Sequence, residues 1–190
     1  MKKVIIFASG SGSNAENIIQ KYHKKEMDVV RVFCNNPNAG IIERCARLQI
    51  DCRIFNKSEW NNLASDLYAE IKNTEANLVI LAGFLWKVNS ILLELFPERI
   101  INIHPSLLPK YGGKGMYGNH VHQAVIENSE KESGITIHLV NSEYDKGAIL
   151  FQKAIPIPQN STPESLASLI HELEYEYFPK VILEYINQIQ

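Results

Sequence analysis

The chain has 190 residues, of which 45% are hydrophobic, which is enough apolar surface for one domain with a full core but not for two. Its 19 Lys and Arg side chains are balanced by 21 Asp and Glu side chains, for a formal net charge of −2. Without a long basic run, this balance lacks the positive charge by which proteins bind nucleic acid or an anionic membrane. We therefore expect one domain, residues 1–190, that acts on small molecules.

Targeting and membrane signals are absent from the sequence. No apolar stretch approaches the roughly 20 residues of a transmembrane helix, and the N-terminal run Val4–Ala8 is too short for the core of a signal peptide. Three cysteines, Cys34, Cys45 and Cys52, have no metal-type spacing, and their odd number suits a reducing compartment. We expect a cytoplasmic protein whose cysteines are ordinary packing residues.

Strand-like runs alternate with helix-length periodic segments through the first half of the chain, which predicts a β-α-β pattern with a parallel sheet. Continuous apolar runs such as Leu78–Leu81 suit parallel strands that are buried on both faces. The predicted strands are Lys3–Ala8, Val29–Cys34, Cys52–Phe55, Leu78–Leu81 and Ile100–Ile103, and the predicted helices are Asn14–Lys25, Ile41–Leu48, Glu59–Lys72 and Ser90–Leu95.

The last part of the chain has a different pattern. A glycine-rich loop and a short helix near His120–Asn128 lead to two strands, Ile135–Val140 and Ile149–Ile157, for which we expect mixed or antiparallel pairing. The sequence thus predicts an α/β fold. We expect a Rossmann-like, doubly wound and mostly parallel sheet with helices on both faces and a mixed or antiparallel C-terminal part.

A long helix is predicted to end the chain. Thr162 followed by Pro163 is a typical start, because threonine caps a helix and proline is favoured at its first position. The helical pattern continues to about Ile186. Pro179 lies inside it and is expected to kink the helix or divide it in two.

Two polar side chains stand at the end of the fifth predicted strand. In Ile101–His104 the period-2 alternation sends Asn102 and His104 to the same face, and Pro105 then stops the strand. An amide and an imidazole placed side by side can stabilise and protonate a developing oxyanion, which acyl transfer requires. A strand end with two solvated polar residues explains the pair equally well.

The turn Asn141–Gly147 offers a carboxylate for this pair. Asp145 alone is typical of a plain turn. Beside His104 it would keep the imidazole protonated and raise the pKa of His104 toward or above neutrality, so that the pair acts as a general acid. Thr136 and His138, on one face of the preceding strand, could flank the same site.

The segment Ser9–Ala15 joins the first strand to the first helix and has the geometry of a phosphate-binding turn. Its glycines fit the pattern G-x-G-x-x-A of dinucleotide enzymes through Gly10, Gly12 and Ala15, which makes a nicotinamide-dependent oxidoreductase a competitor. The second strand, however, leads into Phe33–Pro37, which has no acid for a ribose hydroxyl. A single phosphate fits better.

A plain structural interpretation of the same segment is also open. Ser13 and Glu16 fit a capping box, and the glycines would then only make a tight turn. Helix capping and phosphate binding can coexist.

Two further loops are candidates for the wall of a ligand crevice. Gly83–Val88 follows the fourth strand, and its aromatic and aliphatic side chains suit a flat heterocycle, although such residues more often pack a core. Tyr111–Gly118 is rich in glycine and able to approach a ligand. A metal site is not expected, because His120 and His122 lie two positions apart in a helix-like segment and no H-E-x-x-H motif is present.

Taken together, these landmarks resemble the phosphoribosylglycinamide formyltransferase family over nearly the whole chain. The motif N-x-H-P-S-L-L-P with a downstream Asp is highly specific to formyltransferases that use 10-formyltetrahydrofolate. The matching segments are Ser9–Asn14, Leu81–Phe84, Ile101–Pro109, Gly134–Val140, Asp145 with Gly147, and Glu174 with Pro179. The resemblance implies formyl transfer from 10-formyltetrahydrofolate to the amine of glycinamide ribonucleotide, in de novo purine biosynthesis.

The resemblance also implies a role for individual residues. Asn102 and His104 would hold the formyl oxygen and its oxyanion, and Asp145 would keep His104 charged and relay protons. One set of residues would bind the ribonucleotide: the phosphate-binding turn and a residue that contacts the glycinamide end. A second set of residues would bind the folate. The ribonucleotide residues are Gly12, Ser13, Asn14 and Glu174, and the folate residues are Leu85, Trp86, Lys87, Val88, Asn102 and Tyr144.

The resemblance implies that the partners of the protein are its two small substrates, with 10-formyltetrahydrofolate as the co-substrate. It implies no metal, no nucleic acid and no membrane, and a monomer or a homodimer. Two features depart from the family pattern. Leu85–Val88 stands where the family often has Met-Arg before two aliphatic residues, and the loop Lys110–Gln123 is several residues longer than usual. The alternatives are another formyltransferase or a hydrolase that uses 10-formyltetrahydrofolate, or a non-catalytic nucleotide-binding module.

Overall fold

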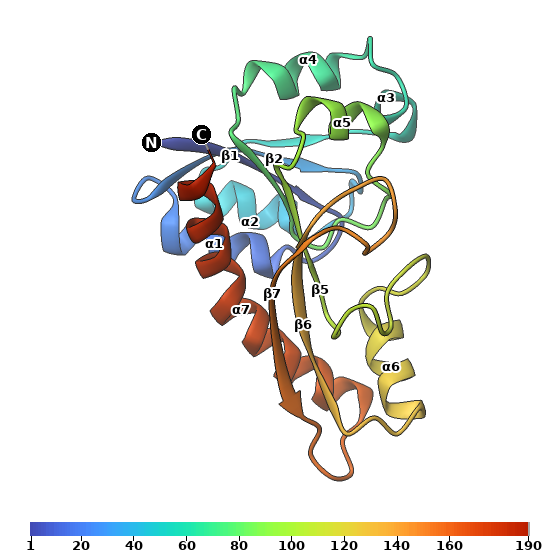
Figure 1. Ribbon diagram of the computed structural model, residues 1–190. Coiled ribbons are helices and arrows are strands. Elements are labelled where there is room, and N and C mark those ends of the chain that lie inside the picture. The colour runs from blue at the N-terminus through green and yellow to red at the C-terminus, as the bar shows by residue number, and fades with distance from the viewer. Residues whose placement is uncertain (190) are drawn as a thin grey trace.

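The structure is a computed structural model that describes residues 1–189, and its strands form one seven-stranded sheet flanked by helices (Figure 1). In chain order the strands are β1 (Lys2–Ala8), β2 (Met27–Cys34), β3 (Cys52–Ile54), β4 (Leu78–Leu81), β5 (Ile100–His104), β6 (Glu132–Leu139) and β7 (Ile149–Pro156). Their order across the sheet is β3-β2-β1-β4-β5-β6-β7. The first five in this order are parallel, and β6 runs antiparallel to both β5 and β7.

Helices cover both faces of the sheet. On one face, the hydrophobic core that we call the α7-side core includes side chains of α1 (Ser13–Tyr22), α2 (Ile41–Leu48), α6 (Asn119–Glu127) and α7 (Pro163–Gln188). On the other face, the α4-side core includes side chains of α3 (Lys57–Trp60), α4 (Asp66–Asn73) and α5 (Ser90–Leu95). Figure 1 shows α3, α4 and α5 on one side of β1 and β2, and α1 and α2 on the other side. The predicted fold class, a Rossmann-like doubly wound sheet with an antiparallel C-terminal part, is confirmed.

Strand β1 shows why a continuous apolar run specifies a central parallel strand. Val4 and Ile6 pack in the α7-side core, and Ile5 and Phe7 pack in the α4-side core. All four side chains are fully buried. Because successive side chains of a strand point to opposite faces, a strand between two layers of helices needs an apolar residue at every position.

The same alternation places the polar pair of β5. Ile101 and Ile103 belong to the α7-side core, whereas Ile100 belongs to the α4-side core. Asn102 and His104 therefore continue the face that Ile100 begins, and both line a cavity there. The prediction that this amide and imidazole share one face is confirmed.

The strand order sets the position of that cavity. From β1 the chain moves outward to β2 and β3, and then returns to place β4 on the other side of β1. The connection after β1 leads to α1 on one face, whereas the connection after β4 leads to α5 on the opposite face. Where the connections of two neighbouring strands leave toward opposite faces of a sheet, a crevice forms at the carboxyl ends of those strands.

The prediction of one continuous helix at Glu59–Lys72 is wrong, because the structure has two short helices there, α3 and α4. A turn separates them, in which the Asn62 side chain accepts a hydrogen bond from the Ala64 N–H (3.1 Å). Asparagine competes with the helix in this way by bonding its own neighbouring backbone. The buried Trp60 ends α3, where it stacks against Phe55 with ring centroids 5.5 Å apart.

Helix α7 begins as predicted. The Thr162 side chain accepts a hydrogen bond from the Ser165 N–H (3.2 Å), and Pro163 is the first helical residue. Although α7 has 26 residues, no helix among residues 1–189 combines the length and the apolar character needed to cross a membrane.

Pro179 does not divide α7, so that alternative of the prediction is wrong. Proline has no N–H, and the carbonyl of Tyr175, four residues earlier, therefore loses its partner within the helix. Two side chains of α1 donate to this carbonyl instead, Asn17 Nδ2 at 2.9 Å and Lys21 Nζ at 2.7 Å. The bond that proline removes is thus replaced by contacts that dock α7 on α1.

We predict that Asn17→Ala lowers the free energy of unfolding by about 1 kcal/mol, because it removes one donor from the Tyr175 carbonyl. Gln20→Ala is the matched control, since Gln20 is exposed on the same helix, and we expect it to change stability by less than about 0.5 kcal/mol. Urea unfolding followed by circular dichroism measures both variants. Equal changes in the two would contradict the docking role of Asn17.

Candidate active site

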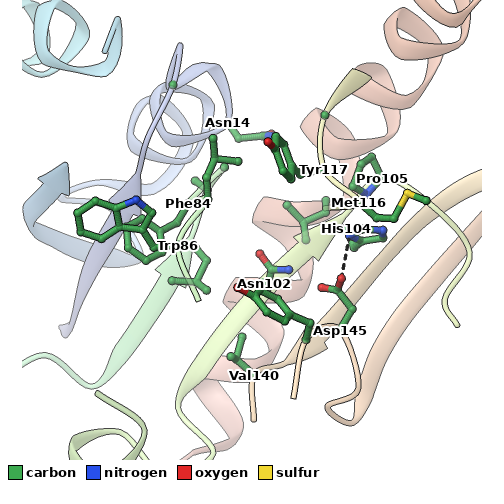
Figure 2. Close-up of a pocket in the computed structure, with 18 of the residues that line it drawn as sticks. Asn14, Phe84, Trp86, Asn102, His104, Pro105, Met116, Tyr117, Val140 and Asp145 are labelled. Atoms are coloured by element: carbon green, nitrogen blue, oxygen red, sulfur yellow. Dashed lines mark ion pairs between the residues drawn. The ribbon is translucent and has the colours of Figure 1, made fainter. Parts of the chain in front are cut away.

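A cavity of about 580 Å³ lies at the carboxyl ends of β1, β4 and β5. Its walls come from the loops after these strands, the glycine-rich segment before α6, the turn between β6 and β7, and one side of α7. Figure 2 shows side chains from several of these segments around the same space. All the residues assigned to the site from the sequence line this cavity: Gly12, Ser13, Asn14, Leu85, Trp86, Lys87, Val88, Asn102, His104, Tyr144, Asp145 and Glu174.

The amide of Asn102 is oriented by His138 on the neighbouring strand. His138 Nδ1 lies 2.8 Å from the carbonyl oxygen of Leu139, so this nitrogen is the donor. His138 Nε2 is then able to accept a hydrogen bond from Asn102 Nδ2 at 3.1 Å. One amide N–H and the Oδ1 of Asn102 remain for other partners. His138 therefore flanks the site, as the sequence suggested.

Thr136, the other flanking candidate, has a structural role instead. It is fully buried, accepts a hydrogen bond from the Leu108 N–H at 3.0 Å and donates to the Ser106 carbonyl at 2.6 Å. These bonds hold the segment that follows His104 against β6.

His104 is fixed by the glycine-rich segment and by Asp145. Its Nε2 lies 2.7 Å from the carbonyl oxygen of Tyr111, which can only accept, so Nε2 carries a proton in the neutral ring and in the charged ring. Its Nδ1 lies 3.7 Å from Asp145 Oδ2 (Figure 2). The same carboxylate oxygen accepts a hydrogen bond from the Gly113 N–H at 2.8 Å. Asp145 thus lies beside His104, as the sequence predicted.

The electrostatics of this pair differ from the expectation. Burial lowers the pKa of His104 below its ordinary value, and the Asp145 carboxylate offsets only part of that effect. The prediction that Asp145 raises the pKa of His104 toward or above neutrality is therefore wrong. Burial alone raises the pKa of Asp145, but His138, the Gly113 N–H and the charge of His104 together bring it below the usual value. Near neutral pH the pair is a neutral imidazole beside an ionised carboxylate.

The turn after β1 has the form of an anion site. Gly12 is the N-cap of α1 with a φ of 76°, in the left-handed region that glycine enters without strain. The first N–H groups of a helix have no partner within it, and they carry the positive end of its dipole. Here they belong to Ser13 and Asn14, which line the cavity. A phosphate group binds readily to such a turn.

The capping box considered for this turn is not present. Gly12 occupies the N-cap position, and no side chain caps α1. Glu16 instead forms ion pairs with Arg44 and Arg47 of α2. The hydrogen bond from Arg47 and the charges of both arginines lower the pKa of Glu16 below its ordinary value, against the opposite effect of burial. The competing partners lie on another helix, where sequence spacing does not reveal them.

A buried carboxylate joins α1 to α7 at the cavity wall. Glu174 is 6% exposed, and its Oε2 accepts a hydrogen bond from Asn14 Nδ2 at 2.8 Å. The same oxygen lies 3.1 Å from His171 Nδ1, and this hydrogen bond raises the pKa of His171. The Oδ1 atom of Asn14 is buried and has no hydrogen-bond partner among residues 1–189.

The loop after β4 gives the cavity a flat, apolar wall. Trp86 lies edge-on to Phe55, with ring centroids 5.8 Å apart, and Lys57 Nζ lies 4.2 Å from the centre of a Trp86 ring. Nearby, Lys87 Nζ lies 5.5 Å from the centre of the Tyr144 ring. This wall suits a flat heterocycle, and in Figure 2 Trp86 and Phe84 stand together on one side of the cavity.

Several residues that line the cavity had no individual role in the sequence analysis, and four of them have side chains suited to contact a ligand. Met116 and Tyr117 come from the glycine-rich loop, His122 from α6 and His171 from α7. Burial lowers the pKa of His122, which is 4% exposed. For His171 a signal was available, because positions three apart on a helix are neighbours and Glu174 is three residues further on. Met116 and Tyr117 lie in Tyr111–Gly118, which the glycine content marked as a loop able to approach a ligand without singling out either side chain.

Neither a metal site nor a cysteine is part of the catalytic group that we describe. Within residues 1–189 no three His, Cys, Asp or Glu side chains gather into a possible metal-ion site. Cys34 and Cys45 are buried in the α7-side core, and Cys52 packs against that core.

The fold and the cavity together define a doubly wound α/β protein with the amide, imidazole and carboxylate of an acyl-transfer enzyme next to an anion-binding turn. The chain belongs to the formyl transferase family, whose sequence model matches residues 2–182. This membership and the relatives described next confirm the resemblance and the formyltransferase activity inferred from the sequence.

Relatives of known function cover nearly the whole chain. The phosphoribosylglycinamide formyltransferase of Bacillus subtilis (strain 168) is 35% identical over 192 residues, which are 98% of this chain and 96% of that protein. The chloroplastic phosphoribosylglycinamide formyltransferase of Arabidopsis thaliana is 38% identical over 187 residues, 95% of this chain and 64% of that longer protein. The crystal structure of glycinamide ribonucleotide transformylase 1 from Geobacillus kaustophilus matches with a TM-score of 0.88 and 30% identity, covering 98% of this chain and 99% of that one.

We predict that Gly12→Ala lowers the free energy of unfolding by about 2 kcal/mol, because alanine is strained at a positive φ and its Cβ would overlap the side chain of Ile41. Gly10→Ala is the matched control in the same loop, where a Cβ meets nothing within 4 Å. Its effect should stay within about 1 kcal/mol in either direction. Urea unfolding of the two variants checks the difference, and a similar loss in both would contradict the steric argument.

Proposed function

We propose that this protein transfers the formyl group of 10-formyltetrahydrofolate to the amine of glycinamide ribonucleotide in de novo purine biosynthesis, with residues 1–190 acting as one catalytic domain. One observation carries the proposal: a single cavity joins an anion-binding turn, a flat aromatic wall and the group Asn102, His104 and Asp145. The phosphoribosylglycinamide formyltransferases among the relatives support the same substrates.

The two substrates have complementary places in the cavity. The phosphate of the ribonucleotide binds the N–H groups at Gly12–Asn14, where the positive end of the α1 dipole favours an anion. Glu174 contacts the glycinamide end, with its carboxylate fixed by Asn14. The folate binds along Leu85–Val88, Asn102 and Tyr144, where its flat ring meets aromatic and aliphatic surface.

Formyl transfer begins when the substrate amine attacks the formyl carbon, which forms a C–N bond and moves the carbonyl electrons onto oxygen. The free N–H of Asn102 stabilises this oxyanion, and His138 keeps the amide in the required orientation. Because both substrates are held in one cavity, the attack becomes effectively unimolecular. Collapse of the tetrahedral intermediate breaks the bond between the formyl carbon and N10 of the folate.

A proton must move from the attacking amine to N10 during these steps. His104 is suited to carry it, because its neutral ring has an unprotonated Nδ1 while Nε2–H is held by the Tyr111 carbonyl. The Asp145 carboxylate then stabilises the imidazolium that forms, at a Nδ1 to Oδ2 distance of 3.7 Å. His104 acts first as a base and then as an acid, and it ends the cycle neutral.

The direct test of the proposal follows formyl transfer by the absorbance of the folate product, with glycinamide ribonucleotide as acceptor. We expect transfer by the parent protein and no release of formate when the ribonucleotide is left out. Formate release without the ribonucleotide would favour a hydrolase, and a parent protein that binds both substrates but transfers nothing would favour a non-catalytic binding module.

We predict that His104→Gln and His104→Ala each reduce kcat by about 10²- to 10⁴-fold, the usual contribution of a positioned acid–base group. The glutamine amide is able to replace the Nε2–H that the Tyr111 carbonyl accepts, but it supplies no base at the position of Nδ1. His104→Gln therefore distinguishes the effect of losing the base from the effect of displacing the loop that carries Tyr111. Near-parental kcat in His104→Gln would rule out the proton-transfer role.

The pH profile tests the protonation state of His104. A base acts only when it is unprotonated, so activity falls as the pH decreases through its pKa. Since the pKa of His104 is lowered, the acid limb of kcat/KM should bend below about 6.5, the ordinary histidine value. Asp145→Asn removes a group that raises this pKa, so the bend should move to still lower pH while kcat falls. A bend above 6.5 in the parent would contradict the neutral resting state.

A further inference from the structure

The loop after β1 is held from outside the cavity by the first turns of α2. The Ile41 N–H donates to the Gly10 carbonyl at 3.2 Å, and Arg44 Nε donates to the Ser11 carbonyl at 2.8 Å. Ser11 lines the cavity, whereas Arg44 does not belong to its lining. A charged side chain behind the wall thus contacts the backbone of the anion-binding turn.

This hydrogen bond determines the orientation of one peptide group. In a planar trans peptide the carbonyl of one residue and the N–H of the next point in opposite directions. Because the Ser11 carbonyl points to Arg44, outside the cavity, the Gly12 N–H points the other way. The same bond keeps the partial negative charge of a carbonyl oxygen away from the place where an anion binds.

A second arginine, Arg47, lies near Arg44 but makes different contacts. Glu16 stands in the first turn of α1, where its negative charge would repel a bound anion. Arg44 and Arg47 both form ion pairs with Glu16, but the bond to the Ser11 carbonyl comes from Arg44. The effect of charge and the effect of the Ser11 bond can therefore be separated by substitution.

We propose that Arg44 is a positioning residue for the phosphate site: through the Ser11 carbonyl it aims the Gly12 N–H at the phosphate monoester of the ribonucleotide. The inference rests on the proposed function for the identity of that ligand. Arg44 donates hydrogen bonds to Ser11 and Glu16 and does not line the cavity that holds the aromatic wall and His104. It therefore affects binding of the ribonucleotide rather than the transfer step.

Two neutral variants of similar length test the bond. The Nε2 of glutamine is as many bonds from Cα as the Nε of arginine, so Arg44→Gln keeps a donor for the Ser11 carbonyl, whereas Arg44→Met has none. Both variants lose the ion pair with Glu16. Arg47→Met is the control for charge, because it removes one partner of Glu16 and leaves Arg44 on Ser11.

The measurements are KM for each substrate, kcat, and the Kd of glycinamide ribonucleotide by calorimetry, with inorganic phosphate as a competing ligand. Arg44→Met should raise both KM and Kd for the ribonucleotide roughly tenfold, as for the loss of one hydrogen bond of a charged group. Its kcat and its KM for the formyl folate should change by less than about twofold. Arg44→Gln should recover most of the affinity, Arg47→Met should stay within about twofold of the parent, and inorganic phosphate should follow the same order.

Several results would overturn the inference. The inference fails if Arg44→Gln binds the ribonucleotide as weakly as Arg44→Met, or if Arg47→Met loses as much affinity. Either result would mean that the positive charge near Glu16, and not the hydrogen bond to Ser11, determines the affinity for the ribonucleotide. Unchanged affinity in Arg44→Met would also exclude the role. A parent protein that binds the ribonucleotide without transferring formyl would overturn the proposed function, while the binding data still decide the role of Arg44. A parent that does not bind the ribonucleotide would overturn both.

Discussion

The side of the cavity that α7 forms is joined to α1 through one backbone carbonyl. Pro179 deprives the Tyr175 carbonyl of its helical hydrogen bond, which leaves a backbone acceptor without a partner inside the helix. Asn17 and Lys21 of α1 supply the missing donors, which docks α7 on α1. Glu174 immediately precedes Tyr175 in α7, so the same docking brings its carboxylate to Asn14. A residue that interrupts a helix in isolation therefore fixes one wall of the site.

The reversal of strand direction after β5 organises the chemistry. Because β6 is antiparallel to β5, His138 lies directly opposite Asn102 in the sheet, and the turn that follows β6 carries Asp145 to His104. Burial then decides the charge: desolvation disfavours an imidazolium more than one carboxylate at 3.7 Å favours it. The site is thus arranged to accept a proton, with a counter-charge already in place to stabilise the product of that transfer.

Much of the fold and of the site follows from local patterns. The alternation in β1 and β5 predicted a buried central strand and a polar pair on one face, and the Thr162 cap predicted the start of α7. Local patterns failed where a distant partner competes. The capping box considered as an alternative for Ser13 and Glu16 is not formed, because Glu16 forms ion pairs with arginines of α2. Division of the helix, one of the two alternatives predicted at Pro179, does not occur, and α1 supplies donors to the carbonyl that proline leaves without a helical partner.

By itself, the sequence determined the order of elements, the two faces of each strand and the identity of the reactive groups, because these depend on side-chain periodicity and residue chemistry within a few positions. Only the tertiary structure decided how those groups behave. The lowered pKa of His104, the orientation of Asn102 by His138 and the bond from Arg44 to Ser11 all join residues from different elements. Burial and contact across elements are set by packing in three dimensions, and local spacing along the chain does not encode them.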